Sequence, residues 1–365
     1  MGTLRMFFIF AVVAFLSACS SGRMGSQPAP TSAIKLKPAY AVMRTFFATD
    51  RNVTGSKKPD EMFGTNRSIL TYGICDVSIP RDHRMGNMES PSMWRLEFRE
   101  NPEDHIVLLN TVINPKDIFF KDIAYQVEKS PKKSAFLFVH GYNVTFEEAA
   151  RRSAQIAYDL NFEGAPVFYS WPSQGATTAY ITDEQNIEWA QKNLRMFLED
   201  FFTRSDAKNV YLIAHSMGTR ALTRAVASLL HDKPYLRNRL KEVIITAPDI
   251  DADVFKTQIA PALTSTGRPI TLYASSKDLA LIASKKIHGG PRAGDSGQGL
   301  TVFTGIETID ATDTDTSLVG HSYFAETRWV LSDIFNLIRN DARADQRFGL
   351  DKIDTKDGHY WKIKR

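Results

Sequence analysis

The chain reads Val210-Tyr211-Leu212-Ile213-Ala214-His215-Ser216-Met217-Gly218 at the point that decides its fold. The first four residues are typical of a buried strand. The residues after Gly218 have the apolar spacing of one helix face: Ala221, Leu222, Ala225, Val226, Leu229 and Leu230. A serine between such a strand and helix is the context of a nucleophile elbow, a tight turn that presents the hydroxyl at the edge of a sheet. The stretch therefore predicts that Ser216 is a nucleophile.

Composition limits the kinds of partner. The 365 residues are 43% hydrophobic and 24% charged, which is typical of a globular protein. The net charge of +4 comes from charges scattered along the sequence, without the basic stripe that nucleic-acid binding requires. The sequence has no ligand cluster for a metal and no phosphate-binding loop. We therefore expect no nucleic acid, no metal and no cofactor.

The first residues form a targeting segment. Arg5 is followed by the apolar run Met6–Leu16, which is too short to span a bilayer. Leu16-Ser17-Ala18-Cys19 resembles the lipobox of bacterial lipoproteins, which implies removal of residues 1–18 and a lipid on Cys19; a plain secretory signal is the alternative. Ser20 after the lipidated position resembles the Gram-negative pattern sorted to the outer membrane. We expect an envelope protein that faces the periplasm and is held by a lipid anchor.

The remaining chain is divided by composition. The expected parts are a flexible tether over 19–38, a strand-rich extension over 39–130, a catalytic domain over 131–340 and a charged tail over 341–365. Strand patterns in the extension cover Val42–Phe47, Leu70–Ile79, Trp94–Phe98 and Ile106–Leu109. If Cys19 carries lipid, Cys75 has no partner for an internal disulfide. We expect Cys75 to be a buried, inert thiol.

The catalytic domain alternates compact apolar runs with longer amphipathic stretches. This pattern predicts a mainly parallel sheet with helices on both faces. The predicted strands are Ala135–Val139, Pro166–Trp171, Val210–Ala214, Val243–Ala247, Ile270–Ala274 and Thr301–Thr304. Three helices are predicted between and after these strands. The first begins at a capping box formed by Thr145 and Glu148, the second covers about Ile187–Phe202, and the last covers about Tyr323–Ile338.

The acid and the base that would serve Ser216 should follow it, in that order, on loops that leave strand ends. Asp278 follows the strand that ends at Ala274, and we prefer it as the acid; Asp249 and Asp251, after the preceding strand, are the rivals. His321 lies after the last predicted strand and just before the last helix, where the base is expected.

The other histidines after Ser216 fit the base role less well. His231 lies at the far end of the elbow helix, His288 follows Asp278 too closely, and His359 lies in the charged tail. For the oxyanion, we expect the backbone N–H groups of Met217 and of Tyr142, which lies in a loop after an early strand. His140, in the same loop, precedes Ser216 in sequence and should support the loop by hydrogen bonding.

Several blocks together resemble one bacterial α/β-hydrolase family of the esterase/lipase superfamily, long labelled the domain of unknown function nine hundred. They are Phe138-Val139-His140-Gly141-Tyr142-Asn143, Tyr169-Ser170-Trp171-Pro172-Ser173, Ala214-His215-Ser216-Met217-Gly218, Ala247-Pro248-Asp249-Ile250-Asp251 and Gly320-His321-Ser322-Tyr323-Phe324, with Phe47-Ala48-Thr49-Asp50-Arg51 and Tyr72-Gly73 nearer the start. The resemblance implies an α/β-hydrolase fold and a hydrolase activity of unstated substrate. It also implies that Ala214, where the elbow motif usually has glycine, is usual for this group.

The expected chemistry is hydrolysis of a small-molecule or lipid ester through an acyl-enzyme. His321 would deprotonate Ser216, Asp278 would orient His321, and water would then release the acyl group. Thioesterase, peptidase or acyltransferase chemistry would use the same three residues. A lipid-anchored protein that uses this fold only for binding is the alternative of a different class.

Overall fold

The computed structural model describes residues 39–92, 97–297, 300–312 and 327–364. Within these ranges one sheet holds eleven strands in the order β10-β11-β9-β8-β7-β6-β4-β5-β1-β2-β3. The strands are β1 (Tyr40–Val53), β2 (Phe63–Pro80), β3 (Leu108–Asn114), β4 (Ser134–Val139), β5 (Ala165–Ser170), β6 (Asn209–His215), β7 (Leu240–Thr246), β8 (Ile270–Ala274), β9 (Glu307–Asp310), β10 (Leu350–Thr355) and β11 (Gly358–Ile363). In this spatial order, every neighbouring pair in the central run β11-β9-β8-β7-β6-β4-β5-β1 is parallel. The outer pairs β1–β2, β2–β3 and β10–β11 are antiparallel.

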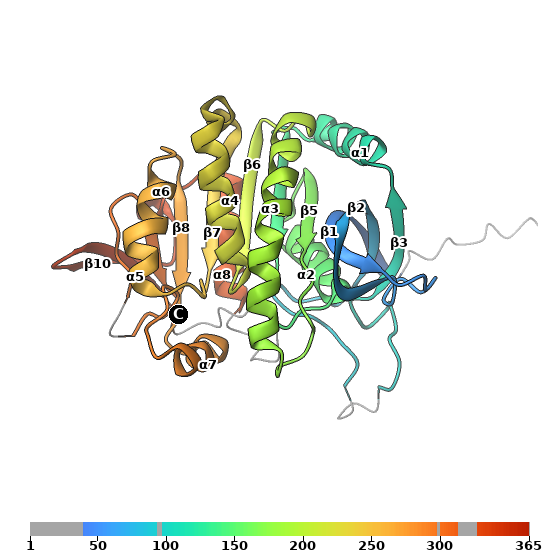
Figure 1. Ribbon diagram of the computed structural model, residues 1–365, viewed down its shortest axis with the longest axis horizontal. Helices are drawn as coiled ribbons and strands as arrows, with labels where there is room; N and C mark the ends of the chain where they lie inside the picture. Colours follow the sequence, from blue (N-terminus) through green and yellow to red (C-terminus); the bar gives the residue numbers. More distant parts are fainter. Residues whose placement is uncertain (1–38, 93–96, 298–299, 313–326, 365) are drawn as a thin grey trace, which may run out of the picture. The chain divides into compact units, whose positions relative to one another are not determined.

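Helices cover both faces of this sheet (Figure 1). One face is covered by α1 (Lys116–Lys129), α3 (Tyr180–Arg204), α4 (Gly218–Asp232) and α6 (Ala260–Thr264), and the other by α2 (Phe146–Asp159) and α8 (Thr327–Asn340). Shorter elements are η2 (Pro234–Arg239), α5 (Ala252–Val254), η3 (Phe255–Ile259), α7 (Leu279–His288) and η4 (Ala344–Gln346). Each face has its own hydrophobic core. Because side chains alternate along a strand, Leu137 and Val139 of β4 pack in the core on the α3 and α4 side, while Phe136 and Phe138 pack in the core on the α2 and α8 side. The predicted fold class, a mainly parallel sheet with helices on both faces and a strand-rich extension, is confirmed.

The helix signals in the sequence act as expected. Thr145 is the N-cap of α2, where its Oγ1 accepts a hydrogen bond from Glu148 N at 3.2 Å and Glu148 Oε2 accepts one from Thr145 N at 2.8 Å. The helix predicted from Ile187 begins earlier, at Tyr180. The last helix is described from Thr327, and the beginning predicted for it at Tyr323 lies outside the described residues.

Two predictions of local structure are wrong. Thr301–Thr304 is not a strand, because this run turns at Gly305, with φ of 90°, and packs Phe303 against the core as a loop; the strand follows at β9. The charged segment 341–365 is not a simple tail, because η4, β10 and β11 lie within it. Trp361 of β11 pairs in parallel with Ile309 of β9, so this segment extends the main sheet.

The strand-rich extension is continuous with the central sheet. Four residues of β1, from Phe46 to Thr49, pair in parallel with β5. Cys75 of β2 is fully buried, and its Sγ lies 3.7 Å from Thr111 Oγ1. Burial raises the pKa of the Cys75 thiol far above its ordinary value, so the thiolate is absent at neutral pH. Residues 93–96, part of the strand predicted at Trp94–Phe98, lie outside the described residues, and the described end of that segment is irregular.

A buried histidine fastens the loop after β2 to α2. His83 Nε2 lies 2.8 Å from Asp159 Oδ1, and its Nδ1 lies 2.8 Å from Glu89 Oε2. Burial alone would lower the pKa of His83, but the two carboxylates outweigh it and raise this pKa to about 9. His83 is therefore a protonated ion-pair partner at neutral pH.

Candidate functional site

Ser216 lies in the strained turn that a nucleophile elbow requires. Its φ is 49°, in the left-handed region that residues other than glycine rarely adopt. The turn is held because Ser216 N donates to Thr246 O on β7 at 2.9 Å, and Thr219 Oγ1 donates to Ser216 O at 2.6 Å. Ser216 is 4% exposed, directly between the end of β6 and the beginning of α4. Strain at one serine, fixed by its neighbours, is typical of a functional position.

Two glycines let the backbone approach Ser216. A methyl group at Gly141 would lie 2.8 Å from His215 Nδ1 and 3.0 Å from Ser216 Cβ. A methyl group at Gly218 would overlap His140 O and lie 2.9 Å from Val139 O. The loop after β4 and the first turn of α4 therefore meet at Ser216 with no room for a side chain.

The N–H groups predicted to bind the oxyanion belong to these two segments. In the part of the chain that the structure describes, neither Tyr142 N nor Met217 N donates to an acceptor. The loop around Tyr142 is fixed, because Asn143 N donates to Asp183 Oδ2 at 3.2 Å and Val144 N donates to Ser173 Oγ at 3.1 Å. Met217 follows Ser216 in the chain, and Tyr142 follows Gly141, whose backbone packs against Ser216.

The histidine beside this loop is part of its support. His140 is fully buried, stacks on Trp171 with ring centroids 5.0 Å apart, and places Nδ1 2.8 Å from Gly141 O. Burial, with the nearby charge of Arg51, lowers the pKa of His140 well below its ordinary value. His140 is therefore neutral, and its contacts are the hydrogen-bonding support that the sequence predicts.

His215, the residue before the serine, is buried without partners. Neither of its ring nitrogens has a hydrogen bond with any described residue. Burial, aided by the charge of Arg152, lowers the pKa of His215 to about 3. This ring is consequently neutral at any pH at which the protein would act.

Asp278 follows β8, two strands along the sheet from β6. Its side chain is the N-cap of α7, where Oδ1 accepts a hydrogen bond from Leu281 N at 2.9 Å, and the residue is 8% exposed. The loop that carries Asp278 contacts the loop after β9, because Ser276 N donates to Thr312 Oγ1 at 3.2 Å. The chain therefore leaves β9 beside Asp278, and His321 lies in the segment that follows, outside the described residues.

The rival acids have other partners. Asp249 is 2% exposed and accepts hydrogen bonds from Tyr180 Oη and Ser284 Oγ, each at 2.5 Å. Arg220 and Arg292 lie at 3.2 and 3.3 Å from its carboxylate oxygens. Asp251 is the N-cap of α5 and accepts from the backbone of that helix. Both carboxylates thus hold structure after β7.

His288 is likewise engaged. Its Nδ1 lies 2.9 Å from Ser284 O and its Nε2 lies 2.8 Å from Glu184 Oε1. This agrees with its exclusion as the base. Cys19, the predicted lipid attachment point, lies outside the described residues.

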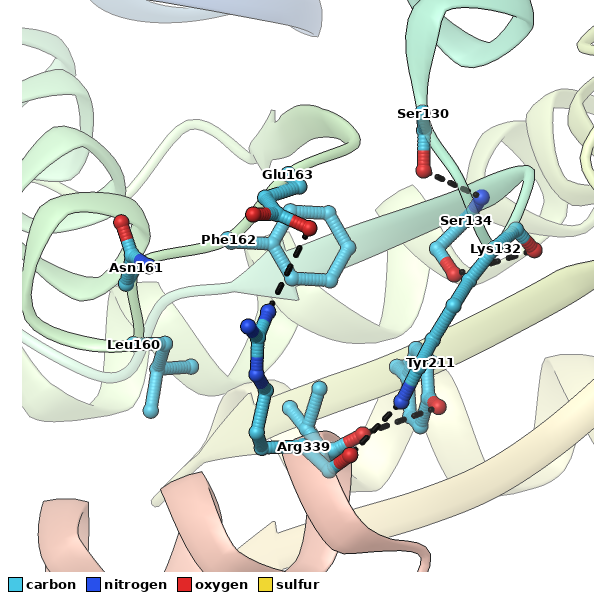
Figure 2. A pocket seen from close by; sticks show the side chains of 10 residues that line it. Ser130, Lys132, Ser134, Leu160, Asn161, Phe162, Glu163, Tyr211 and Arg339 are labelled. Atoms are coloured by element: carbon cyan, nitrogen blue, oxygen red, sulfur yellow. Dashed lines mark hydrogen bonds and ion pairs between the residues drawn. The ribbon is translucent and has the colours of Figure 1, made fainter.

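Other kinds of site are not found near Ser216 among the described residues. Among the residues that the structure describes, no cluster of histidine, cysteine and acidic side chains could hold a metal ion. A helix with the length and apolar character needed to cross a bilayer is also lacking in these ranges. Figure 2 shows a small pocket at the opposite edge of the sheet, where strands β4 and β6 begin. There Lys132 Nζ donates to Arg339 O at 2.6 Å, and Arg339 pairs with Glu163. These contacts bind the end of α8, and the pocket lies at the opposite edge of the sheet from Ser216.

Sequence reasoning assigned no role to two residues that support the site. Asp183 of α3 accepts from Asn143 N and from Ser173 Oγ, at 3.2 and 2.6 Å. Arg51 of β1 is 1% exposed and bonds loops that follow both β4 and β5. The sequence does contain a signal for Arg51, because Asp50 and Arg51 are adjacent charged residues that closely follow the apolar run Phe46–Ala48.

Curated proteins and solved structures give different results when they are compared with this chain. A search of curated proteins gave no match. The chain is similar to the solved structure of a protein described as a predicted CIB-like hydrolase from Thermoplasma acidophilum, with 12% identity, a TM-score of 0.34, and coverage of 82% of this chain and 99% of that one. It is similar to Est1E from Butyrivibrio proteoclasticus, with 11% identity, a TM-score of 0.35 and coverage of 58% and 88%. A monoacylglycerol lipase from Paleococcus ferrophilus gives 12% identity, a TM-score of 0.33 and coverage of 58% and 96%.

The family comparison covers more than half of the chain, from the start of α1 to the end of α8. The sequence pattern of the family described as alpha/beta hydrolase of unknown function (DUF900) matches residues 116–340. The matched range contains the elbow, the loop after β4 and the acidic loops after β7 and β8. The chain therefore belongs to this α/β-hydrolase family.

Proposed function

We propose that this protein is a serine hydrolase of carboxylic esters. The observation that carries the proposal is Ser216 in its left-handed turn, next to two residues, Tyr142 and Met217, whose N–H groups bond to no described residue. A fixed serine with two donors beside it is the arrangement that acyl transfer needs, because negative charge develops on the carbonyl oxygen in the transition state. Family membership supports a hydrolase in general and leaves the substrate open.

The reaction proceeds in two steps in this proposal. His321 takes the proton of Ser216 Oγ, which bonds to the ester carbonyl carbon, and the N–H groups of Tyr142 and Met217 bind the oxyanion. Collapse of the tetrahedral intermediate expels the alcohol, which receives the proton from His321. Water then attacks the acyl-enzyme by the same route and releases the acid.

Asp278 is the acid that orients His321 in this proposal. Asp249, the rival that is also buried, binds two hydroxyl groups and two guanidinium groups, which gives it a structural role. The loop of Asp278 is also the one bonded to the exit of β9, from which the chain continues toward His321. The proposal further places the protein at the envelope, on the outer membrane facing the periplasm, through lipid on Cys19.

The test is labelling with a fluorophosphonate and hydrolysis of p-nitrophenyl esters of increasing acyl length. Ser216→Ala and His321→Ala should each abolish both, and the double variant should be no slower, because triad members act as a unit. Ser228→Ala, on the same helix α4 but bonded to Arg195 on the surface, is the matched control and should match the wild type. A folded wild type that takes no label would instead favour a binding protein. Comparing matched thioesters and amides under the same conditions defines the bond that is cleaved.

A further inference from the structure

Arg51 is a buried cation whose guanidinium bonds to one hydroxyl group and three backbone carbonyls. Its guanidinium donates to Ser170 Oγ at 2.8 Å, Ser173 O at 2.8 Å, Val144 O at 2.7 Å and Gly64 O at 3.2 Å. Within the described residues no acidic side chain bonds to it. Burial of an unpaired charge is costly unless every donor finds an acceptor. Two of these acceptors, Val144 O and Ser173 O, lie on the loops that follow β4 and β5.

One of these bonds is the first of three consecutive hydrogen bonds, from Arg51 to Ser170, from Ser170 to His140 and from His140 to Gly141, which we call the relay. Because Arg51 Nε can only donate, Ser170 Oγ accepts from it and is free to donate its own proton to His140 Nε2, 3.3 Å away. His140 Nδ1 lies 2.8 Å from Gly141 O, and a carbonyl can only accept, so Nδ1 carries the ring proton. A neutral imidazole with its proton on Nδ1 has an acceptor at Nε2, so the directions of all three bonds agree.

The relay ends on one peptide group. The carbonyl of Gly141 and the N–H of Tyr142 belong to the same planar trans peptide, so they point in opposite directions. A hydrogen bond that fixes Gly141 O therefore also fixes where Tyr142 N–H points. The second bond, from Arg51 to Val144 O, holds the same loop on its other side.

We propose that Arg51 is a positioning residue for the oxyanion donor, acting through Ser170 and His140 on the Gly141–Tyr142 peptide. The inference rests on the proposed function, because it assigns Tyr142 N–H to the oxyanion. A positive charge at the start of the relay also polarises each following hydrogen bond, which makes Tyr142 N–H a stronger donor. Lysine could not replace Arg51, because one ammonium cannot reach four acceptors in a fixed fork.

Ser170→Ala is the most selective test, since it breaks the relay and leaves the bonds of Arg51 to three backbone carbonyls. We expect kcat for p-nitrophenyl ester hydrolysis, per site titrated with fluorophosphonate, to fall roughly 10- to 100-fold, with KM within about 2-fold. The inhibition constant of a trifluoromethyl ketone, which forms an oxyanion on Ser216, should rise by the same factor as kcat falls. Titration counts folded sites, so a loss due only to unfolding would not appear in kcat per site.

Arg51→Met and a double variant test the direction of the relay. If Arg51 acts through Ser170, adding Ser170→Ala to Arg51→Met should lower kcat per site by less than about 2-fold. Two control variants distinguish loss of the relay from a general loss of stability. Arg347→Met removes another buried arginine, one bonded to Asp333 at 2.8 Å, and Arg44→Met removes an exposed arginine of the same strand β1; both should keep wild-type kcat per site.

The outcomes separate this proposal from the proposed function. Wild-type kcat per site in Ser170→Ala, or an undiminished effect of Ser170→Ala in the Arg51→Met background, would overturn the relay while Ser216-dependent hydrolysis stands. An equal loss in Arg347→Met would also overturn it, because the effect would then be one of general stability. A wild type without Ser216-dependent turnover would overturn both proposals together.

Discussion

Replacement of Gly218 by alanine tests how closely the elbow must approach β4. The added methyl group would overlap His140 O and lie 2.9 Å from Val139 O and 3.1 Å from His140 C. These are backbone atoms, so no side chain can rotate to make room. His140 O is also fixed as the acceptor of Trp171 Nε1 at 2.8 Å, which prevents the carbonyl from swinging away.

The loss of stability in Gly218→Ala follows from the distance that α4 must move away from β4. Restoring ordinary contact requires a shift on the order of 1 Å, and overpacking of this kind costs about 1–3 kcal/mol. Alanine gains back about 1 kcal/mol of helix propensity, so the net loss of stability should be about 0–2 kcal/mol. A displacement of about 1 Å at a catalytic group costs about 100-fold in rate, and this shift acts directly on Ser216 and Met217 N–H. Activity should therefore fall far more than stability.

Gly164→Ala is the matched control. Its methyl group would overlap Ser134 O and lie 2.9 Å from Ser134 C, but at the opposite edge of the sheet, where β4 and β5 begin. Denaturant unfolding and kcat/KM for p-nitrophenyl butyrate should be measured for both variants. We expect both to lose stability and only Gly218→Ala to lose about 100-fold in kcat/KM. Wild-type kcat/KM in a folded Gly218→Ala variant would refute the argument that close approach of α4 to β4 sets the geometry of the site.

The other expected outcomes concern the acid, a buried ion pair, the extension and the lipid anchor. Asp278→Asn should lower kcat by several orders of magnitude, whereas Asp249→Asn should lower mainly the unfolding temperature, and reversed results would move the acid to Asp249. The pKa of His83 is about 9 when folded and about 6.5 when unfolded, so its stabilisation is complete below pH 6.5 and is lost as pH rises through 9. Denaturant titrations at pH 6 and 9.5 should differ by on the order of 3 kcal/mol, and His83→Gln should remove that difference if the assignment is right. A chain that begins at Lys132 should be insoluble or inactive, and wild-type activity in it would show that the extension is independent. Cys19→Ser should release the protein from membranes after a high-salt wash; equal retention of both forms would contradict lipid anchoring.

The sequence could predict the central sheet because local and tertiary signals agree there. The apolar run before Ser216 is a buried strand in the structure, and Thr145 makes the capping box that its spacing indicates. Thr301–Thr304 shows the limit, since its β-branched and aromatic residues favour a strand but are packed as a loop. The charged composition of residues 341–365 likewise led to the wrong prediction of a tail. Strand β10 within it is exposed and polar, yet it is ordered by pairing with β11. These residues depend on tertiary pairing, which no local pattern contains.

The support of the site was harder to predict for a related reason. Arg51 and Val144 are far apart in sequence, and their bond exists only because β1 runs parallel to β5. Since the carboxyl ends of parallel strands meet at one edge of a sheet, the end of β1 lies at the same edge as the loops after β4, β5 and β6. An antiparallel strand in this place would bring its beginning to that edge and leave Arg51 at the other. The direction of β1 therefore explains why a residue before the family's matched range can support a serine within it, and why removing the extension should affect the rate as well as the stability.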